Sequence, residues 1–430
     1  MPEHRATLLD AGRLASAADD AERLARAALA IASDTLDYDV DAGRLALVED
    51  ALSRVPPESA TAARLHSALA CETDPREWTT VQHHALRAVE IARAIGEEAV
   101  LLHTLLSWVS VCASPDDVET RIAAMEQAAS MADRLGDQPA RFLARYQLAI
   151  SLMETADVIA ADAAYADARQ IADALHLPYL DWQVLLDLGA RVAGAADFAG
   201  AEALADGALA LATRAGFAVG LGAYGGQLHD IRFAQGRAGE IADFFVEAAN
   251  AMPAIESLRA AVIPLLLVTG DEAAARERFE QERAAGFAYV PTIGWFNTLE
   301  AIADACVEVR DRDSAEILLE MGRPYVGRLV ASHAVPSRPV ARPIARLAGL
   351  LGRDDEADAA FATALELCDR LGAPYWKART LVDRAEWRLR RNGPGDAELA
   401  EQDLAEALAL AEPIGADSIP QRVERIRADS

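Results

Sequence analysis

Positive charge is scarce in this sequence, and lysine is almost absent from it. Lys377 is the only lysine, and 41 lysine and arginine residues face 68 aspartate and glutamate residues, which gives a formal net charge of −27. Proteins that hold nucleic acid through its phosphates need a basic surface, and anionic membranes attract basic segments. The composition therefore predicts a chain that binds neither nucleic acid nor a membrane surface.

Cysteines and long apolar runs are also scarce. Residues 1–20 carry charges throughout, so they do not resemble a secretory signal. The longest apolar run, residues 260–268, contains a proline and is too short to cross a bilayer. The absence of any C-x-x-C pair favours buried, reduced thiols in a cytoplasmic protein. The four cysteines are Cys71, Cys112, Cys306 and Cys368.

Motifs for catalysis and cofactor binding are missing. The sequence contains no H-E-x-x-H, no G-x-S-x-G, no G-x-x-x-x-G-K-[ST] and no cysteine and histidine spacing typical of zinc. Residues 220–225 spell G-x-G-x-x-G, but a dinucleotide site needs a strand before this motif, and residues 201–214 have a helical pattern. We therefore expect no metal and no cofactor.

What the sequence has instead is a pattern that returns every 40 residues. A fixed period of this size is typical of stacked helical repeats, and the abundant alanine favours helix over sheet. One column of the repeat holds mostly large residues: Met125, Tyr165, Ala205 and Phe245. The column three residues further on holds only alanine: Ala128, Ala168, Ala208 and Ala248. Helix-ending residues keep the same spacing: Gly96, Gly136, His176 and Gly216.

The predicted fold is all-α, a tetratricopeptide-like right-handed superhelical solenoid of about ten helical pairs that forms one domain over residues 1–430. We expect irregular repeats in residues 1–77, regular repeats of about 40 residues in residues 78–330, and further repeats in residues 344–430. Residues 331–343 contain three prolines, a density that helices do not tolerate. This Pro-rich loop is either a surface connection between repeats or a loop folded over the concave groove.

Parts of the sequence resemble two helical-repeat families. The pattern A-x-x-x-[FY]-x-x-A at residues 161–168 and 357–364 matches the second helix of the tetratricopeptide repeat. The runs at residues 41–70, 224–241 and 349–389 are similar to the C-terminal helical half of bacterial signal-transduction ATPases, including LuxR-type transcription regulators and cyclase-linked ATPases. The resemblance implies a sensor or scaffold half in signal transduction. Because the ATP-binding motif is missing and the chain is acidic, it implies neither ATP hydrolysis nor DNA binding.

A polar column on the first helix of each pair gives the core of a candidate site. First helices line the concave face in tetratricopeptide-like stacks, so this column is expected to line a groove or pocket, with Arg191 and Tyr224 one turn away from it. A solvated face without a ligand is the alternative. The column, one residue before an expected core position in each repeat, reads Ser107, Gln147, Asp187 and Gln227.

Two further groups extend this candidate site. The five glycines within residues 216–226 indicate either close helix packing or a close approach of a ligand to the backbone, and two polar residues follow them on the same helix. Aromatic residues that open later first helices, at 295–296 and 375–376, pack between repeats or stack on a ligand. The predicted ligand-binding residues are Gln147, Asp187, Arg191, Tyr224, Gln227, His229, Arg232, Trp295 and Asn297.

These features predict a function in recognition. The preferred hypothesis is a regulatory module that holds a peptide, a partner protein or a small effector in its concave groove. One alternative is an enzyme that modifies a small molecule in a capped pocket, with a carboxylate or histidine of shifted pKa. Its residues would come from Asp187, Arg191, Tyr224, Gln227 and His229. The other alternative is a structural adaptor that oligomerises through its outer face or ends, for example as a homodimer.

Overall fold

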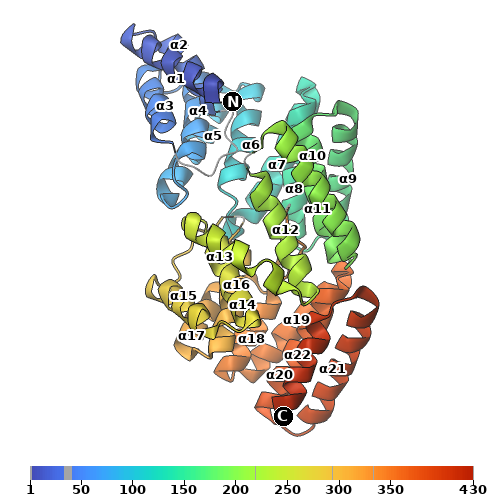
Figure 1. Ribbon diagram of the computed structural model, residues 1–430. Helices are drawn as coiled ribbons and strands as arrows, with labels where there is room; N and C mark the ends of the chain where they lie inside the picture. The colour runs from blue at the N-terminus through green and yellow to red at the C-terminus, as the bar shows by residue number, and fades with distance from the viewer. Residues whose placement is uncertain (1, 33–40, 218, 293, 333, 430) are drawn as a thin grey trace.

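The protein is built from stacked helices (Figure 1). The computed structural model describes residues 2–32, 41–217, 219–292, 294–332 and 334–429. Within these residues there are 22 α-helices, four short 3₁₀ helices and one pair of two-residue strands. The prediction of an all-α helical-repeat solenoid is confirmed.

The first half of the chain consists of antiparallel helices that pack on their neighbours in sequence. The first four helices enclose an apolar cluster of their own: α1 (Pro2–Ala17), α2 (Ala21–Ala32), α3 (Ala42–Arg54) and α4 (Ala60–Glu72). The next helices are α5 (Trp78–Ile95), α6 (Glu98–Val111), η1 (Pro115–Asp117), α7 (Val118–Leu135), α8 (Gln138–Glu154), α9 (Val158–Leu175), α10 (Pro178–Gly194), α11 (Phe198–Ala215) and α12 (Gly220–Ala234).

The second half begins with shorter helices and a less regular spacing. These elements are η2 (Ala238–Glu240), α13 (Ala242–Ala251), α14 (Glu256–Thr269), α15 (Glu272–Ala284), α16 (Trp295–Val309), α17 (Arg312–Gly322) and η3 (Arg323–Tyr325). After a β-hairpin, the chain continues through α18 (Ala341–Leu351), α19 (Asp354–Leu371), α20 (Pro374–Arg391), α21 (Asp396–Ala411), η4 (Glu412–Ile414) and α22 (Ser418–Asp429).

The 40-residue pattern has a direct structural meaning. All four members of the mostly large column are buried, as expected for positions that face the neighbouring helices of a stack. Each of the four helix-ending residues, including the non-glycine His176, has a positive φ in the left-handed region. Aspartates then begin the following helices: the side chains of Asp157, Asp197 and Asp271 accept hydrogen bonds from backbone N–H groups in the first turn.

The Pro-rich loop is part of a β-hairpin, which we define as residues 329–340. Its strands β1 (Leu329–Val330) and β2 (Arg338–Pro339) pair in antiparallel register. Residue 333 lies outside the described part of the chain. The loop boundary predicted at residue 343 is wrong, because α18 already begins at Ala341 and Pro343 lies in its first turn, where a missing N–H group costs no helical hydrogen bond.

The second half of the solenoid returns to pack against the first half (Figure 1). α10 contacts α20, and α12 contacts α22. One apolar cluster joins residues 193–234 to residues 368–426, and we name this cluster the closing seam. Near η3, Tyr325 Oη donates a hydrogen bond to Asp116 Oδ1 at 2.6 Å across 209 residues of sequence. The turn of the superhelix is therefore closed by contacts that no single repeat contains.

The four cysteines differ in their burial. Cys112, Cys306 and Cys368 are buried, as expected, but Cys71 is exposed. This thiol lies two turns after the exposed Arg64, on the same side of α4.

None of the helices in the described residues is long and apolar enough to cross a lipid bilayer.

Removing a buried side chain from the closing seam should lower the stability of the helices that meet there. Phe198 is buried in the seam, and its ring centre lies 6.2 Å from that of Tyr375 on α20. Phe198→Ala should destabilise the protein by about 3–4 kcal/mol and lower the hydrogen-exchange protection of α20 and α22. Phe142→Ala, which removes a buried ring from α8 outside the seam, is the matched control. Equal loss of protection in α20 and α22 in both variants would contradict this role.

Candidate functional site

A cavity of about 600 Å³ lies between α12, α13, α14, α16 and α20, with the hairpin on one side. Three large apolar side chains that line it, Leu221, Phe244 and Met252, are substantially exposed. Further apolar side chains come from α12, α13, α14 and the residues between them: Phe233, Phe245, Ile255 and Leu258. The walls that these elements form are therefore apolar.

One glycine of α12 allows close helix packing, and three others line the cavity. A side chain at Gly220 would place its Cβ 2.4 Å from the Cβ of Ala212, so this glycine allows close packing of α11 and α12. Gly222, Gly225 and Gly226 instead line the cavity. Because they carry no side chains, the backbone of α12 forms part of the cavity wall.

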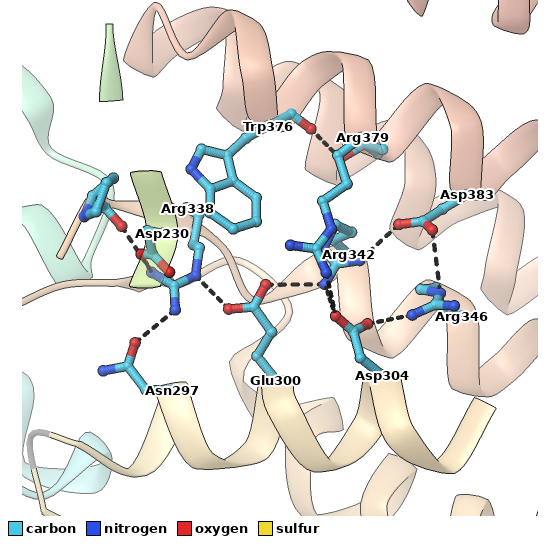
Figure 2. Close-up of polar contacts among 12 residues, drawn as sticks. Asp230, Asn297, Glu300, Asp304, Arg338, Arg342, Arg346, Trp376, Arg379 and Asp383 are labelled. Carbon is cyan, nitrogen blue, oxygen red and sulfur yellow. Dashed lines mark hydrogen bonds and ion pairs between the residues drawn. The ribbon is translucent and has the colours of Figure 1, made fainter. Parts of the chain in front are cut away.

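Charged residues of α12, α16, β2 and α20 also line the cavity. Figure 2 shows the polar contacts that they make with one another and with α18. On α16, Glu300, Asp304 and Glu308 follow one another at four-residue spacing, so they lie on one face of the helix. Three arginines with the same spacing meet them, one in β2 and two in α18. We refer to this set, together with Asp383 of α20, as the arginine ladder: Arg338, Arg342 and Arg346 with Glu300, Asp304, Glu308 and Asp383.

Each arginine of the ladder donates hydrogen bonds to two or more acceptor side chains. Arg342 Nη2 donates to Glu300 Oε1 at 3.0 Å and to Asp304 Oδ2 at 2.5 Å, and its Nη1 donates to Asp383 Oδ2 at 2.7 Å. Arg346 donates to Asp304 and, at 2.6 Å, to Glu308 Oε1. The ladder therefore connects α16, α18 and α20 through buried charges, except at its end, where Glu308 is exposed.

The ladder keeps its buried carboxylates ionised. Burial alone would raise the pKa of Asp304, but Arg342, Arg346 and Arg379 together hold that pKa below its usual value. Burial opposes ionisation of Asp383 in the same way, and Arg422, Arg346 and Arg342 again hold the pKa low. Each buried anion thus has cationic partners that offset its loss of hydration.

Arg338 and Arg379 carry the ladder to the cavity surface. Arg338 donates to Glu300, and its Nη2 donates to Asn297 Oδ1 at 2.7 Å. Arg379 donates from Nη2 to Asp304 Oδ2 at 2.7 Å. The guanidinium carbon of Arg379 lies 5.2 Å from the ring centre of Trp376 and 5.1 Å from that of Phe233. Aromatic and cationic groups therefore meet where the apolar walls end.

His229 of α12 also faces this cavity. Its Nδ1 lies 3.0 Å from Asp230 Oδ1, and its ring centre lies 5.2 Å from that of Phe245. The other ring nitrogen, Nε2, is buried and has no hydrogen-bond partner among the described residues.

A second cavity, of about 240 Å³, lies beside the first. Tyr165, Asp187 and Arg191 line it from α9 and α10, and the hairpin contributes Ser332 and Ser337. Val335 of the hairpin lines both cavities. The hairpin therefore folds inward and separates the two cavities, which agrees with the loop folded over the groove and not with a surface connection.

The structure divides the predicted ligand-binding residues. His229 and Asn297 line the first cavity, and Asp187 and Arg191 line the second. Arg191 pairs with Asp187 at 3.4 Å, and its guanidinium carbon lies 4.7 Å from the ring centre of Tyr165. Burial raises the pKa of Asp187 to about 6, against the opposing effect of Arg191. Of the five residues predicted for an enzyme, Asp187 and Arg191 line one cavity and His229 lines the other, while Tyr224 and Gln227 line neither.

The other five predicted residues make contacts within the helical stack. Gln227 is buried, donates from Nε2 to the Leu186 carbonyl oxygen at 2.9 Å, and occupies space left by Gly189. Tyr224 Oη donates to Asp206 Oδ1 at 3.0 Å, and Arg232 pairs with Glu202. Trp295 packs in the core against Tyr325, and Gln147 Nε2 lies 3.4 Å from Ser110 Oγ. None of these five residues lines either cavity, and neighbouring helices engage their side chains, so their part in ligand binding stays a prediction.

Sequence reasoning missed the charged residues at the cavity, although the repeat contains a sign of them. Arg342 bonds Glu300 across 42 residues and Asp383 across 41 residues. Both separations equal about one repeat, so opposite charges occupy matching positions in the successive first helices α16, α18 and α20. Reading charges as well as apolar residues along the repeat would have identified these pairs.

The arrangement suits binding better than metal chemistry. Within the described residues, no group of three or more histidine, cysteine, aspartate or glutamate side chains is placed to hold a metal ion. The carboxylates of the ladder are fully engaged with guanidinium groups. What the cavity offers a ligand is apolar surface, aromatic rings and a small number of polar atoms.

Comparison with known proteins adds little to this geometry. No protein-family model matches the chain, and no curated protein matches it. Among solved structures, the chain is similar to a Rap protein complexed with competence and sporulation factor, with 13% identity and a TM-score of 0.46 over 86% of this chain and 99% of that chain. It is also similar to a circular tandem repeat protein with novel repeat topology, with 15% identity and a TM-score of 0.16 over 100% of this chain and 88% of that chain. The resemblance to signalling ATPases stays a prediction.

The arginine ladder predicts a large cost for removing one of its buried charges. Arg342→Met keeps the length of the side chain but leaves Glu300, Asp304 and Asp383 without a shared partner. We therefore expect the free energy of unfolding, measured in urea, to fall by about 3–5 kcal/mol. Arg353→Met, which breaks an exposed pair with Glu316, is the control and should cost less than about 1 kcal/mol. Equal costs for the two variants would show that the ladder does not stabilise the protein.

The raised pKa of Asp187 predicts a pH-dependent effect of Asp187→Asn. An unfolded aspartate loses its proton near pH 3.9, whereas folded Asp187 keeps it until about pH 6, so its contribution to stability falls as pH rises through this window. Asparagine cannot ionise, so at about pH 8 the variant should be more stable than the parent by up to about 3 kcal/mol. At about pH 4 the difference should nearly vanish. Urea unfolding at both pH values measures this difference in the free energy of unfolding. Asp173→Asn, on the exposed side of α9, is the control.

Proposed function

We propose that this chain is a helical-repeat binding module, and that the cavity between α12, α14, α16 and α20 receives a ligand with an apolar body and a polar end. The observation that carries the proposal is the combination, in about 600 Å³, of apolar walls with charged and aromatic groups at one side. Cavities of roughly 300–1,000 Å³ with this composition commonly bind small molecules or parts of peptides.

The exposed apolar residues support the same conclusion. Leu221, Phe244 and Met252 are each more than 40% exposed, and all three line this one cavity. Single exposed apolar residues are ordinary, but a group of them around a concave surface costs hydration free energy until something covers it. A ligand that enters the cavity would cover part of each.

The surrounding structure favours a preformed site. The arginine ladder fixes α16 relative to α18 and α20, and the closing seam fixes α12 relative to α22. A site whose walls do not rearrange binds without the cost of ordering them. Recognition by first-helix side chains, as the sequence suggests, therefore remains part of this proposal, with a different set of residues. A role of the module in signal transduction stays a prediction from the resemblance.

Filling the cavity should weaken the binding of an apolar probe. Ala261 of α14 is half-buried and lines the cavity, so Ala261→Trp should lower the affinity for the neutral fluorophore N-phenyl-1-naphthylamine at least roughly tenfold. Fluorescence titration measures this affinity, and circular dichroism checks that the helices remain.

The control for this test is Ala362→Trp, which places the same ring on the exposed side of α19. The control should bind the probe like the parent protein. If the parent shows no saturable binding, or if both variants bind as it does, the cavity is not the binding site.

A further inference from the structure

Arg379 faces the cavity with hydrogen-bonding capacity that the protein does not use. A guanidinium group has five N–H donors. Among the described residues, Arg379 makes one side-chain hydrogen bond, from Nη2 to Asp304, and no partner is present for Nε or Nη1. The side chain is only 14% exposed, and neither donor is among the buried atoms without a partner, so both stay accessible from the cavity. Donors in such a place gain free energy when an acceptor reaches them.

The ladder does not depend on Arg379 for its charge balance. Asp304 also accepts hydrogen bonds from Arg342 and Arg346, so three guanidinium groups surround this one carboxylate (Figure 2). Arg342 and Arg346 are themselves bonded to further carboxylates. Arg379 is therefore the member of the group whose positive charge is least engaged.

The remaining charges at this side of the cavity are paired with each other. Glu300 is bonded by Arg338 and Arg342, and Asp230 lies 3.3 Å from Arg338 Nη1. Glu247, the other carboxylate that lines the cavity, is exposed to solvent. A ligand that enters the apolar space thus meets one cation with spare donors, between the rings of Trp376 and Phe233.

One neutral group next to this cation adds to the same preference. Asn297 lines the cavity and uses its Oδ1 to accept from Arg338, which leaves its amide N–H groups as donors. Oxygen atoms of an anionic group are the acceptors that such donors bind most strongly.

We propose that the ligand of this cavity is an apolar molecule with a carboxylate head group, and that Arg379 binds the carboxylate while the walls of α12, α13 and α14 hold the apolar part. This inference rests on the proposed function, because it assigns a chemical class to the ligand of the same cavity. Arg379 is then the residue that determines specificity for the head group.

The test compares three probes that share one alkyl tail and differ only in charge: decanoate, decanol and decylamine. Calorimetric titration at about pH 7.5, where the carboxyl group is ionised, gives their dissociation constants. We expect decanoate to bind at least roughly tenfold more tightly than decanol, and decylamine to bind most weakly. In Arg379→Gln, decanoate and decanol should bind equally, while the affinity for decanol stays within about twofold of the parent value.

Arg276→Gln is the control, because Arg276 is an exposed residue of α15 and its loss changes the net charge by the same amount. This variant should keep the preference for decanoate. If all three probes fail to bind the parent protein, the proposed binding function itself is wrong. If decanol or decylamine binds the parent as tightly as decanoate, or if Arg379→Gln keeps the preference, the cavity binds apolar molecules but the assignment of the carboxylate is overturned.

Discussion

The buried arginine ladder is the constraint on which the second half of this structure depends. Charges removed from water are tolerated only where opposite charges meet them at hydrogen-bonding distance. Arg342 satisfies carboxylates from two helices at once, Glu300 and Asp304 on α16 and Asp383 on α20. A shift of α18 by one helical turn relative to α16 would leave several of these charges without partners. The ladder therefore fixes the register of consecutive repeats, which apolar packing alone would specify less strictly.

This register also shapes the cavity. The side chains of the ladder that face inward form its charged side, while α13 and α14 supply apolar walls from the least regular part of the solenoid. The hairpin fills the space toward α9 and α10 and separates the two cavities at Val335. Binding capacity thus arises where the regular stack is interrupted, because a perfectly periodic stack leaves no enclosed space between its helices.

The sequence predicted the repeat well and the site only in part. The columns of buried residues and the left-handed helix ends follow from local packing and local backbone preferences, so each repeat reveals them. At Gln227, polarity at a first-helix position predicts a groove residue, but a buried amide can equally well bond a backbone carbonyl of the preceding repeat, as it does at Leu186. Of the predicted ligand-binding residues, His229 and Asn297 line the first cavity, together with Arg338 and Arg379, which the apolar columns of the repeat do not reveal.

The sequence by itself determined the helices, their ends and the stacking of each pair on the next, because these depend on interactions within about one repeat length. Only the tertiary structure decided that the turn closes on itself. Tyr325 meets Asp116 across 209 residues, and Phe198 meets Tyr375 in the closing seam. Such contacts depend on the small rotation between successive repeats added over the whole chain, and no single repeat carries that sum. The place of the cavity, and the side chains that face it, follow from this closure.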